Sequence, residues 1–338
     1  MLISWNVTKA CNLKCSHCYR DAGKKDPQEL NTKEAKELLQ DIAHANFKII
    51  ILSGGEPLLR KDIYELISFA ASLSLRPVLG TNGTFITKEV ADKLKKAGLT
   101  RAGISIDSID AKIHDEFRQK KGAWEATVKG MKACKEVGLD FQAHTTVSQT
   151  NFREIEKITD FVVGLGACAH HIFFLVPTGR GKEIDDFSLK PKDYEELLRK
   201  IVLRQKEMKI ELKPVCAPQF IPLAGEMGLE SRFQRGCLAG ISYCCILPNA
   251  DVHPCPYLPI KLGNVRQEKF SEIWRNNKIL LELRSLNFKG KCGECAYKGT
   301  CGGCRARAYY RFGDYMAEDP DCSYSDKVRG ILDVKPKR

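Results

Sequence analysis

The chain has 338 residues, of which 43% are hydrophobic and 28% charged, and its formal net charge is +12. This length is enough for one barrel plus a small module, and no run approaches about 18 uninterrupted apolar residues, so no membrane span is expected. The positive charge is not gathered into a basic stripe interleaved with aromatic residues, which argues against nucleic acid as a partner.

Strand-like and helix-like segments alternate from the start of the chain. Strand-like runs begin near Leu2, Lys48, Leu75, Arg101, Asp140 and His170. Apolar residues recur at helical spacing in 32–45, 62–73, 88–97, 124–137, 152–163 and 191–208. Asn31, followed three residues later by Glu34, fits the cap of the first helix. The alternation predicts an α/β fold with a parallel sheet and helical crossovers.

The number of cysteines, fifteen, indicates metal binding. Met1 leads almost directly into the first strand-like run, which leaves no room for a signal peptide. Without an export signal we expect a cytoplasmic, reducing setting, in which cysteines bind metal rather than form disulfides.

Three of these cysteines, Cys11, Cys15 and Cys18, follow the first predicted strand with the spacing C-x3-C-x2-C. Three thiolates can hold three irons of a 4Fe–4S cluster and leave the fourth iron open to a small ligand. The alternative is a structural zinc knuckle with an outlying fourth ligand. The spacing favours the cluster.

A second motif, Ser-Gly-Gly-Glu-Pro, ends the second predicted strand. Gly54 and Gly55 would let a ligand approach the backbone closely. Glu56, just before Pro57, would point to the same place and could receive an ammonium group.

Together these motifs resemble those of the radical S-adenosylmethionine (radical SAM) enzymes. The resemblance implies a partial (β/α)6 TIM-like barrel, open along one side. It implies that Cys11, Cys15 and Cys18 hold a 4Fe–4S cluster whose open iron chelates S-adenosylmethionine (AdoMet). One electron then cleaves AdoMet to a 5′-deoxyadenosyl radical, which removes a hydrogen atom from the substrate.

The same resemblance assigns further AdoMet contacts. The amino group would lie at the residues Gly54, Gly55, Glu56 and Pro57. Tyr19 would lie near the adenine, and Asn82 and Ser105 would make polar contacts at strand ends. Arg118 would pair with the AdoMet carboxylate, which suits a guanidinium. The alternatives are a turn residue for Asn82 and an ordinary surface arginine for Arg118.

The last third of the chain is rich in cysteine and glycine, with cysteines at Cys237, Cys244, Cys245, Cys255, Cys292, Cys295, Cys301, Cys304 and Cys322. Such a segment cannot build much core, so inorganic crosslinks would organise it. Structural zinc and iron–sulfur clusters could both use these thiolates. Zinc ribbons usually separate their cysteine pairs more widely than the five residues between Cys295 and Cys301.

This segment resembles the SPASM extension of radical SAM enzymes, which holds two auxiliary 4Fe–4S clusters. The resemblance assigns the first cluster to Cys237, Cys244, Cys255 and Cys304, and the second to Cys292, Cys295, Cys301 and Cys322. The choice of Cys244 over Cys245 stays open. Two departures are mild: Ala250 replaces a common glycine, and the interval from Cys301 to Cys304 is one residue short. Cys134, Cys168 and Cys216 lie outside the motifs and are expected to be buried apolar residues, with Cys216 as a candidate reactive thiol.

These resemblances predict three parts of the chain. Residues 1–215 would form the radical SAM core and residues 216–326 the auxiliary iron–sulfur domain. Residues 327–338 would be a basic tail.

The run 169–181, which contains His170, His171 and Arg180, is similar to the corresponding run in SPASM enzymes of siroheme-dependent haem synthesis and haem d1 synthesis. So are Trp5-Asn6 and 301–308. The resemblance implies an oxygen-sensitive oxidoreductase or lyase that removes acetate or carbon dioxide from an anionic iron tetrapyrrole in haem or porphyrin biosynthesis. Arg180 would hold substrate carboxylates, and His170 or His171 would ligate the porphyrin iron or donate a proton. The alternative is that one histidine faces the core and the other packs under a helix.

Two other functions stay open at this point. The first is maturation of a ribosomal peptide or peptide-derived cofactor, although too few residues precede Cys11 for the leader-binding domain of many such enzymes. The second is a non-enzymatic zinc module with a basic partner-binding surface, against which the open three-cysteine loop before Gly-Gly-Glu-Pro argues. For an enzyme, the positive charge suits an acidic electron donor such as flavodoxin or ferredoxin, and a lysine-rich solvated surface explains it equally well.

Overall fold

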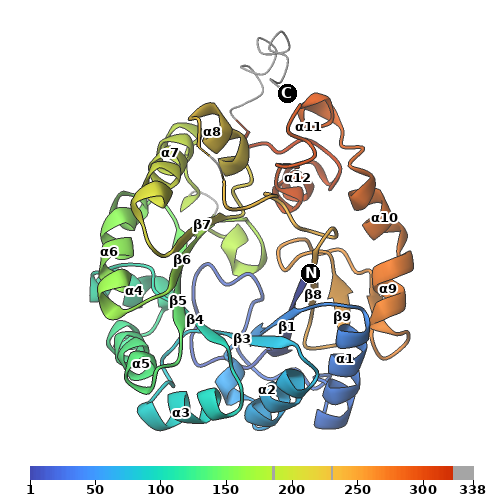
Figure 1. Ribbon diagram of the computed structural model, residues 1–338. Helices are drawn as coiled ribbons and strands as arrows, with labels where there is room; N and C mark the ends of the chain where they lie inside the picture. The colour runs from blue at the N-terminus through green and yellow to red at the C-terminus, as the bar shows by residue number, and fades with distance from the viewer. Residues whose placement is uncertain (185–186, 230, 323–338) are drawn as a thin grey trace.

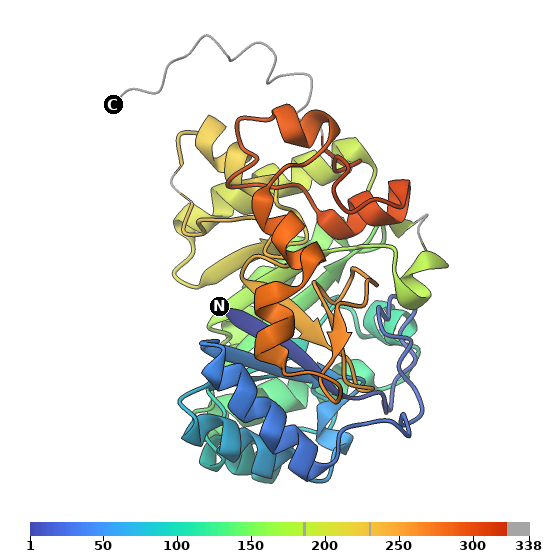
Figure 2. The same ribbon diagram turned by 90° about the vertical axis from the view of Figure 1, so that its right-hand side faces the viewer.

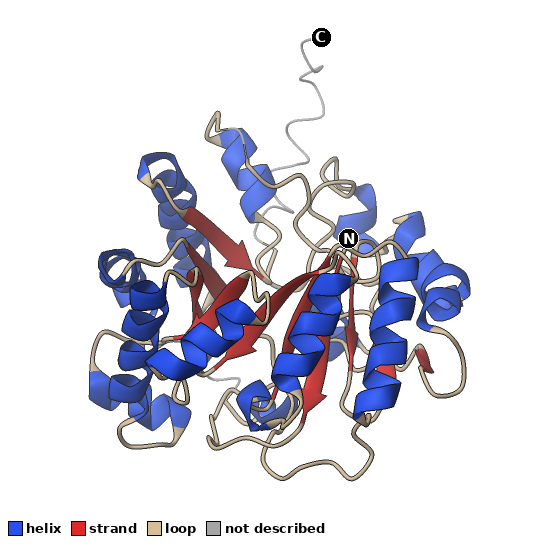
Figure 3. Cartoon of the chain, turned by 60° about the horizontal axis from the view of Figure 1, so that its bottom comes forward, coloured by secondary structure: helices blue, strands red, loops and turns tan. Residues whose placement is uncertain are grey.

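A ten-stranded sheet in the order β10-β9-β8-β1-β2-β3-β4-β5-β6-β7 forms the centre of the fold. The computed structural model describes residues 1–184, 187–229 and 231–322, so the predicted basic tail lies outside the described residues. The strands curve around the middle of the molecule and the helices lie outside them (Figures 1 and 3).

Neighbouring strands from β1 to β7 are parallel. Their bounds are β1 (Leu2–Thr8), β2 (Ile49–Gly54), β3 (Arg76–Thr81), β4 (Arg101–Ser105), β5 (Phe141–Val147), β6 (Ala169–Phe174) and β7 (Glu211–Val215). The connecting helices are α1 (Thr32–His44), α2 (Ile63–Ser72), α3 (Lys88–Lys96), α4 (Ala111–Arg118), α5 (Ala123–Val137), α6 (Ile155–Leu165) and α7 (Pro191–Glu207). Short 3-10 turns lie at η1 (Pro57–Leu59), η2 (Phe152–Glu154) and η3 (Gly179–Lys182). The predicted α/β barrel is confirmed, whereas α4 and the added strand β7 were not predicted.

The C-terminal region continues the same sheet. Its elements are α8 (Phe220–Glu226), β8 (Tyr243–Ile246), β9 (Asp251–His253), β10 (Gly263–Asn264), α9 (Phe270–Asn276), α10 (Lys278–Ser285), α11 (Gly290–Glu294) and α12 (Arg305–Phe312). Strand β8 pairs in parallel with β1, and α9 and α10 lie outside it (Figure 2). The segment with α11 and α12 lies on the side between β7 and β8 (Figure 1). The predicted auxiliary region is therefore joined to the barrel by backbone hydrogen bonds.

Side chains alternate between the two faces of each strand, as the pleat requires. On β5 and β6, Ala143, Ile172 and Phe174 belong to the hydrophobic core that packs against the helices. The intervening residues His144 and His171 are half-buried and therefore face the barrel interior. This alternation decides which residues can reach a substrate.

The predicted cap of α1 is confirmed. The Asn31 side chain accepts a hydrogen bond from the Glu34 backbone N–H at 3.0 Å, and the Glu34 carboxylate accepts one from the Asn31 N–H at 2.8 Å. Asn31→Ala should therefore lower the free energy of unfolding by about 1 kcal/mol. Thermal melting of the apoprotein measures this loss, with Lys33→Ala on the same helix as the control. A melting temperature unchanged by Asn31→Ala would mean that the cap contributes nothing.

Candidate active site

The cysteines of the first motif lie together in the loop after β1. Cys11, Cys15 and Cys18 pack with Leu13 and Ala123 in one small apolar cluster. Burial raises the pKa of the Cys11 thiol to about 11 and raises the pKa of Cys15 as well. Buried thiolates of this kind need a cationic partner, which a bound metal supplies.

The donors and their spacing fit an iron–sulfur cluster. The Leu13 and Ala22 backbone N–H groups each lie 3.4 Å from a sulfur, those of Cys11 and Cys18, and such hydrogen bonds stabilise cluster thiolates. Among the described residues, no three His, Cys, Asp or Glu side chains converge on a site for a single metal ion. A 4Fe–4S cluster binds each thiolate to a different iron, so its ligands stand further apart than those of one ion.

The Gly-Gly-Glu-Pro motif lies directly against this loop. The Gly55 N–H donates to the Thr8 carbonyl at 2.8 Å, and the Glu56 N–H donates to the Ala10 carbonyl at 2.7 Å. A Cβ atom at Gly55 would overlap the Ala10 carbonyl. The motif predicts that these glycines let a ligand approach the backbone. In the structure, Gly55 lets the backbone of the cluster loop approach closely.

This close packing makes Gly55 sensitive to substitution. Gly55→Ala should displace Ala10, and with it Cys11, because backbone on both sides leaves no flexible side chain to move. We expect reconstituted Gly55→Ala to hold about one 4Fe–4S cluster fewer than the unchanged protein, as measured by iron content. Gly164→Ala, where a Cβ meets nothing, is the matched control. Equal iron content in the two variants would contradict this packing argument.

Glu56 is fully buried beside the loop. Its carboxylate accepts hydrogen bonds from the Thr81 hydroxyl at 2.8 Å, the Asn82 N–H at 2.9 Å and the Leu58 N–H at 3.1 Å. Burial nevertheless raises the pKa of Glu56 to about 7. A carboxylate so poorly solvated is stabilised by an adjacent cation, so the site suits an ammonium group.

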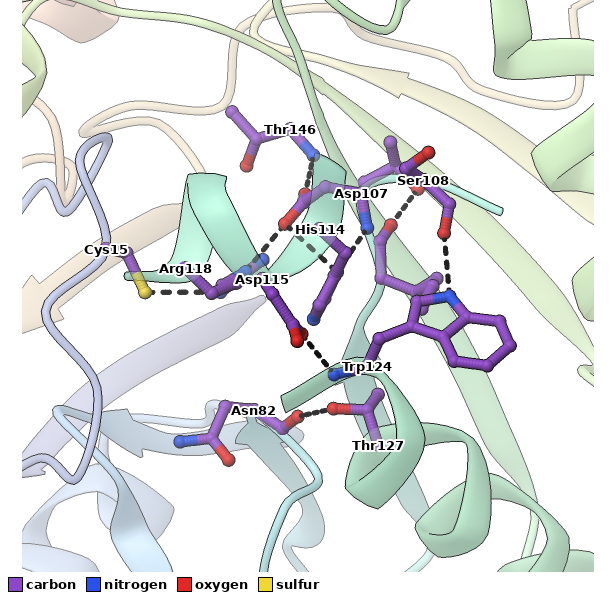
Figure 4. Close-up of polar contacts among 12 residues, drawn as sticks. Cys15, Asn82, Asp107, Ser108, His114, Asp115, Arg118, Trp124, Thr127 and Thr146 are labelled. Atoms are coloured by element: carbon purple, nitrogen blue, oxygen red, sulfur yellow. Dashed lines mark hydrogen bonds and ion pairs between the residues drawn. The ribbon is translucent and has the colours of Figure 1, made fainter. Parts of the chain in front are cut away.

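Arg118 and Asp107 form a buried ion pair that reaches the cluster loop (Figure 4). The Arg118 Nε donates to Asp107 Oδ2 at 2.6 Å, and its Nη1 lies 3.8 Å from the Cys15 sulfur. Burial alone would raise the pKa of Asp107, but the charge of Arg118 holds it below its usual value. Arg118 is therefore not an ordinary surface arginine. Asp107 was missed in the sequence, although it follows Ser105 by two residues at the end of β4.

The remaining predicted AdoMet contacts lie in the cluster loop and at or just after strand ends. The Asn82 amide donates to Asn12 at 2.8 Å, which ties the end of β3 to the cluster loop. Ser105 is half-buried at the end of β4. The Tyr19 hydroxyl donates to the Asn6 side chain at 3.2 Å. Pro57 is buried at the first position of η1.

Arg180, a predicted substrate contact, forms hydrogen bonds with the cluster loop instead. Its Nε donates to the Cys15 carbonyl at 3.0 Å, and its Nη1 donates to the Asp21 carboxylate at 2.8 Å and the Ala22 carbonyl at 3.1 Å. These contacts favour a positioning role over recognition of a substrate carboxylate.

The two adjacent histidines face opposite sides of β6. His170 is fully buried, with its ring nitrogens 2.8 and 2.9 Å from the Thr145 and Thr159 hydroxyls, and burial lowers its pKa to about 3. His170 packs under α6, as one of the two histidines does in the alternative without a role in the reaction. His171 faces the barrel interior, with its Nε2 2.7 Å from Glu211, and its ring stacks on His144 at 5.5 Å. His144 was not predicted as a site residue, although alternation along β5 could have indicated it.

Three cysteines of the second predicted set lie near one another. Burial raises the pKa of the Cys301 thiol, and the nearby sulfurs of Cys322 and Cys292 raise it further. The Cys292 sulfur accepts hydrogen bonds from Arg305 at 3.5 Å and the Asp319 N–H at 3.3 Å. Cys295, their predicted companion, accepts one from the Tyr297 N–H at 3.4 Å.

In the first predicted set, burial raises the pKa of the Cys255 thiol, and the nearby sulfurs of Cys237, Cys304 and Cys245 raise it further. Cys244 does not join them, because it pairs with Ile3 on the face of β8 that enters the hydrophobic core.

Comparison with known proteins agrees with this site. Residues 5–162 match the radical SAM superfamily, and residues 237–305 match the SPASM iron–sulfur cluster-binding domain. The chain is 44% identical to the AdoMet-dependent heme synthase of Methanosarcina barkeri, over 96% of each chain. The chain belongs to the radical SAM superfamily. As a radical SAM enzyme with a SPASM domain, it uses AdoMet and 4Fe–4S clusters.

Other relatives and solved structures agree with this assignment. The AdoMet-dependent heme synthase of Nitratidesulfovibrio vulgaris is 40% identical over 96% of this chain and 93% of its own. The pre-heme d1 synthase of Dinoroseobacter shibae is 33% identical over 95% and 85%. The fold matches Streptococcus suis SuiB bound to S-adenosylmethionine, with a TM-score of 0.74, 19% identity and coverage of 95% and 77%. No helix in the described part of this radical SAM enzyme has both the length and the apolar character to cross a bilayer.

Proposed function

We propose that this radical SAM enzyme is an AdoMet-dependent haem synthase that shortens side chains of an iron tetrapyrrole. The supporting observation is the 44% identity to a protein of that name over 96% of both chains. A Fe-coproporphyrin III synthase of Methanosarcina barkeri is 32% identical to this chain, whereas two mycofactocin maturases are 28% identical to it. The tetrapyrrole assignment is therefore favoured over the peptide maturase.

The barrel interior offers cations to an anionic substrate. Lys213 on β7 lies beside His171 in register, with its Nζ 4.5 Å from the centre of the Phe233 ring, and burial lowers its pKa. Arg20 lies over the Tyr19 ring and donates to the Cys245 sulfur at 3.6 Å. Its Nε is buried without a hydrogen-bond partner among the described residues. We assign Lys213 and Arg20 to the substrate carboxylates, in place of Arg180.

The residues around AdoMet have separate roles in this proposal. Cys11, Cys15 and Cys18 hold the cluster, which together with AdoMet supplies the 5′-deoxyadenosyl radical for hydrogen abstraction. Glu56 receives the ammonium group. Arg118, held by Asp107 beside Cys15, pairs with the carboxylate, and Tyr19, Asn82 and Ser105 border the rest of the ligand.

The interior histidines can accept a proton or ligate iron near the substrate. His171 shares its Nε2 with Glu211, and the stacked His144 lies in register beside it. Burial lowers the pKa of His171 and lowers that of His144 further. Both rings are therefore neutral at pH 7, so either can accept a proton or ligate a porphyrin iron.

The outer side of the cluster loop suits an acidic electron donor such as a flavodoxin or ferredoxin. An open surface pocket there is lined by Lys14, Ser16, Gln119, Arg180 and Glu183, among others. Lys14 is exposed between two cluster cysteines, and the chain has a net charge of +12. None of the fifteen cysteines forms a disulfide, which fits a reducing cytoplasm.

The test is 5′-deoxyadenosine release by anaerobically reconstituted protein with reductant and AdoMet, with and without Fe-coproporphyrin or didecarboxysiroheme. The proposal expects release to be stimulated by one of these tetrapyrroles. Mass spectrometry should then show that the porphyrin has lost carbon dioxide or acetate. Release that ignores every tetrapyrrole would refute the substrate and leave the radical SAM assignment in place.

A further inference from the structure

Cys216 stands outside the cysteine motifs but lies among their thiols. It follows β7 directly, and its backbone φ is 59°, a left-handed conformation that is unusual for a residue other than glycine. Such a conformation persists only where the surrounding structure fixes it, and it is most often found at functional sites.

The neighbours of Cys216 are the cysteines of the first auxiliary set. Burial raises the pKa of the Cys216 thiol, the nearby sulfurs of Cys304, Cys255 and Cys237 raise it further, and Arg307 lowers it. Cys216 packs with Cys255 against the small apolar cluster that contains Cys304. Cys216 and the three other cysteines, from four separate segments, are therefore neighbours between the end of β7 and the start of α12.

Cys244, the fourth ligand expected from sequence, lies on the wrong face of β8. It is opposite Ile3 and is fully buried in the hydrophobic core, with Cys245 and Arg284 as its neighbours. Cys245 points to the barrel interior and lies near Cys255, but its sulfur accepts hydrogen bonds from Asn6 at 3.5 Å and Arg20 at 3.6 Å.

We propose that Cys216 is the fourth protein ligand of the first auxiliary 4Fe–4S cluster, together with Cys237, Cys255 and Cys304. Four cysteine thiolates are the usual ligand set of such a cluster. The cluster would then join the last parallel strand of the barrel to the cysteine-rich region, because Cys216 alone of the four comes from the end of a barrel strand.

Arg307 holds this arrangement in place. Its Nη1 donates to the Cys216 carbonyl at 2.6 Å, and its other donors reach Asp319 at 3.0 and 2.9 Å. Asp319 in turn accepts from the Cys304 N–H at 2.6 Å. One buried network therefore fixes the backbone of two of the four proposed ligands. The positive charge of Arg307 also offsets part of the negative charge of a cluster with four thiolates.

The test uses full-length protein in which Cys11, Cys15 and Cys18 are alanine, so that only auxiliary clusters remain. In this background Cys216→Ala should lose about half of the bound iron, because one of two clusters is lost. Cys216→Ser should retain more iron and shift the EPR spectrum of the dithionite-reduced protein, because an oxygen ligand replaces sulfur. The matched controls Cys244→Ala and Cys245→Ala should keep both the iron and the spectrum.

An iron content and EPR spectrum unchanged by both Cys216 variants would overturn the proposal. So would loss of the cluster in either control while the Cys216 variants keep it. If Cys216→Ala fails to fold, as circular dichroism would show, the spectral shift of Cys216→Ser decides the question. Neither readout involves a tetrapyrrole, so failure of the proposed substrate would leave this result unaffected.

Discussion

Alanine in place of Cys15 is expected to abolish 5′-deoxyadenosine release completely. Cys15 is buried among the two other thiols of the loop, and its sulfur lies 3.8 Å from Arg118 Nη1. Without it the cluster has only two protein ligands, and its position relative to AdoMet is lost. We also expect bound iron to fall by about a third, since one of three clusters would be missing. The measurements are release by chromatography and iron by chemical assay.

The matched control for Cys15 is Cys134. Cys134 is also a fully buried cysteine, but it packs in the hydrophobic core on α5 away from the cluster loop. Cys134→Ala should keep both iron and AdoMet cleavage. Cleavage retained by Cys15→Ala would refute the assignment of this loop as the AdoMet-binding cluster site.

Glutamine in place of Glu56 is expected to weaken AdoMet binding at least tenfold, about 1.4 kcal/mol, at pH 8. The Glu56 carboxylate is the proposed partner of the AdoMet ammonium, and it is fully buried. Truncating one member of a buried charge pair usually has an effect of this size or larger. Anaerobic titration calorimetry at several pH values measures it, with the exposed Glu116→Gln as the control.

The pH dependence provides a second test of Glu56. Its pKa is raised from 4.5 to about 7 by burial, so the carboxylate gains a proton as the pH falls through 7. AdoMet affinity of the unchanged protein should therefore decrease below pH 7, whereas that of Glu56→Gln should not respond. The same pH dependence in both proteins would show that another group titrates.

The free energy of unfolding of the apoprotein should increase as the pH falls, whereas the affinity for AdoMet decreases. Because the folded-state pKa of Glu56 lies above its unfolded value, this group favours folding most at pH below 4.5. That contribution is lost as the pH rises through about 7. The contribution of Glu56 to the free energy of unfolding differs by roughly 3 kcal/mol between pH 4 and pH 8. Glu56→Gln should abolish this part of the pH dependence of unfolding.

Elements with local signals could be predicted from the amino-acid sequence. The strand–helix alternation, the cap formed by Asn31 and Glu34, and the cluster loop with Cys11, Cys15 and Cys18 all depend on residues close together in the chain. Short-range spacing decides hydrophobic periodicity, capping and metal-ligand patterns, so these features could be recognised before any fold was known. The contact between this loop and the Gly-Gly-Glu-Pro turn could also be expected, because both come directly after strands that are adjacent and parallel in the sheet.

The direction of individual side chains depends on how distant strands pair. Asn6 meets Cys245 across 239 residues of sequence, because β8 pairs with β1, and the register of that pairing sends Cys244 into the core. A shift of one residue would exchange the two cysteines, so no local signal could distinguish them. Alternation along β6 likewise sends His170 and His171 to opposite faces. Cys216 lies near thiols that are distant in the chain because the end of β7 and the start of α12 are neighbours in the fold. Local spacing fixed what chemistry the chain can perform, and long-range strand register fixed which atoms are in place to perform it.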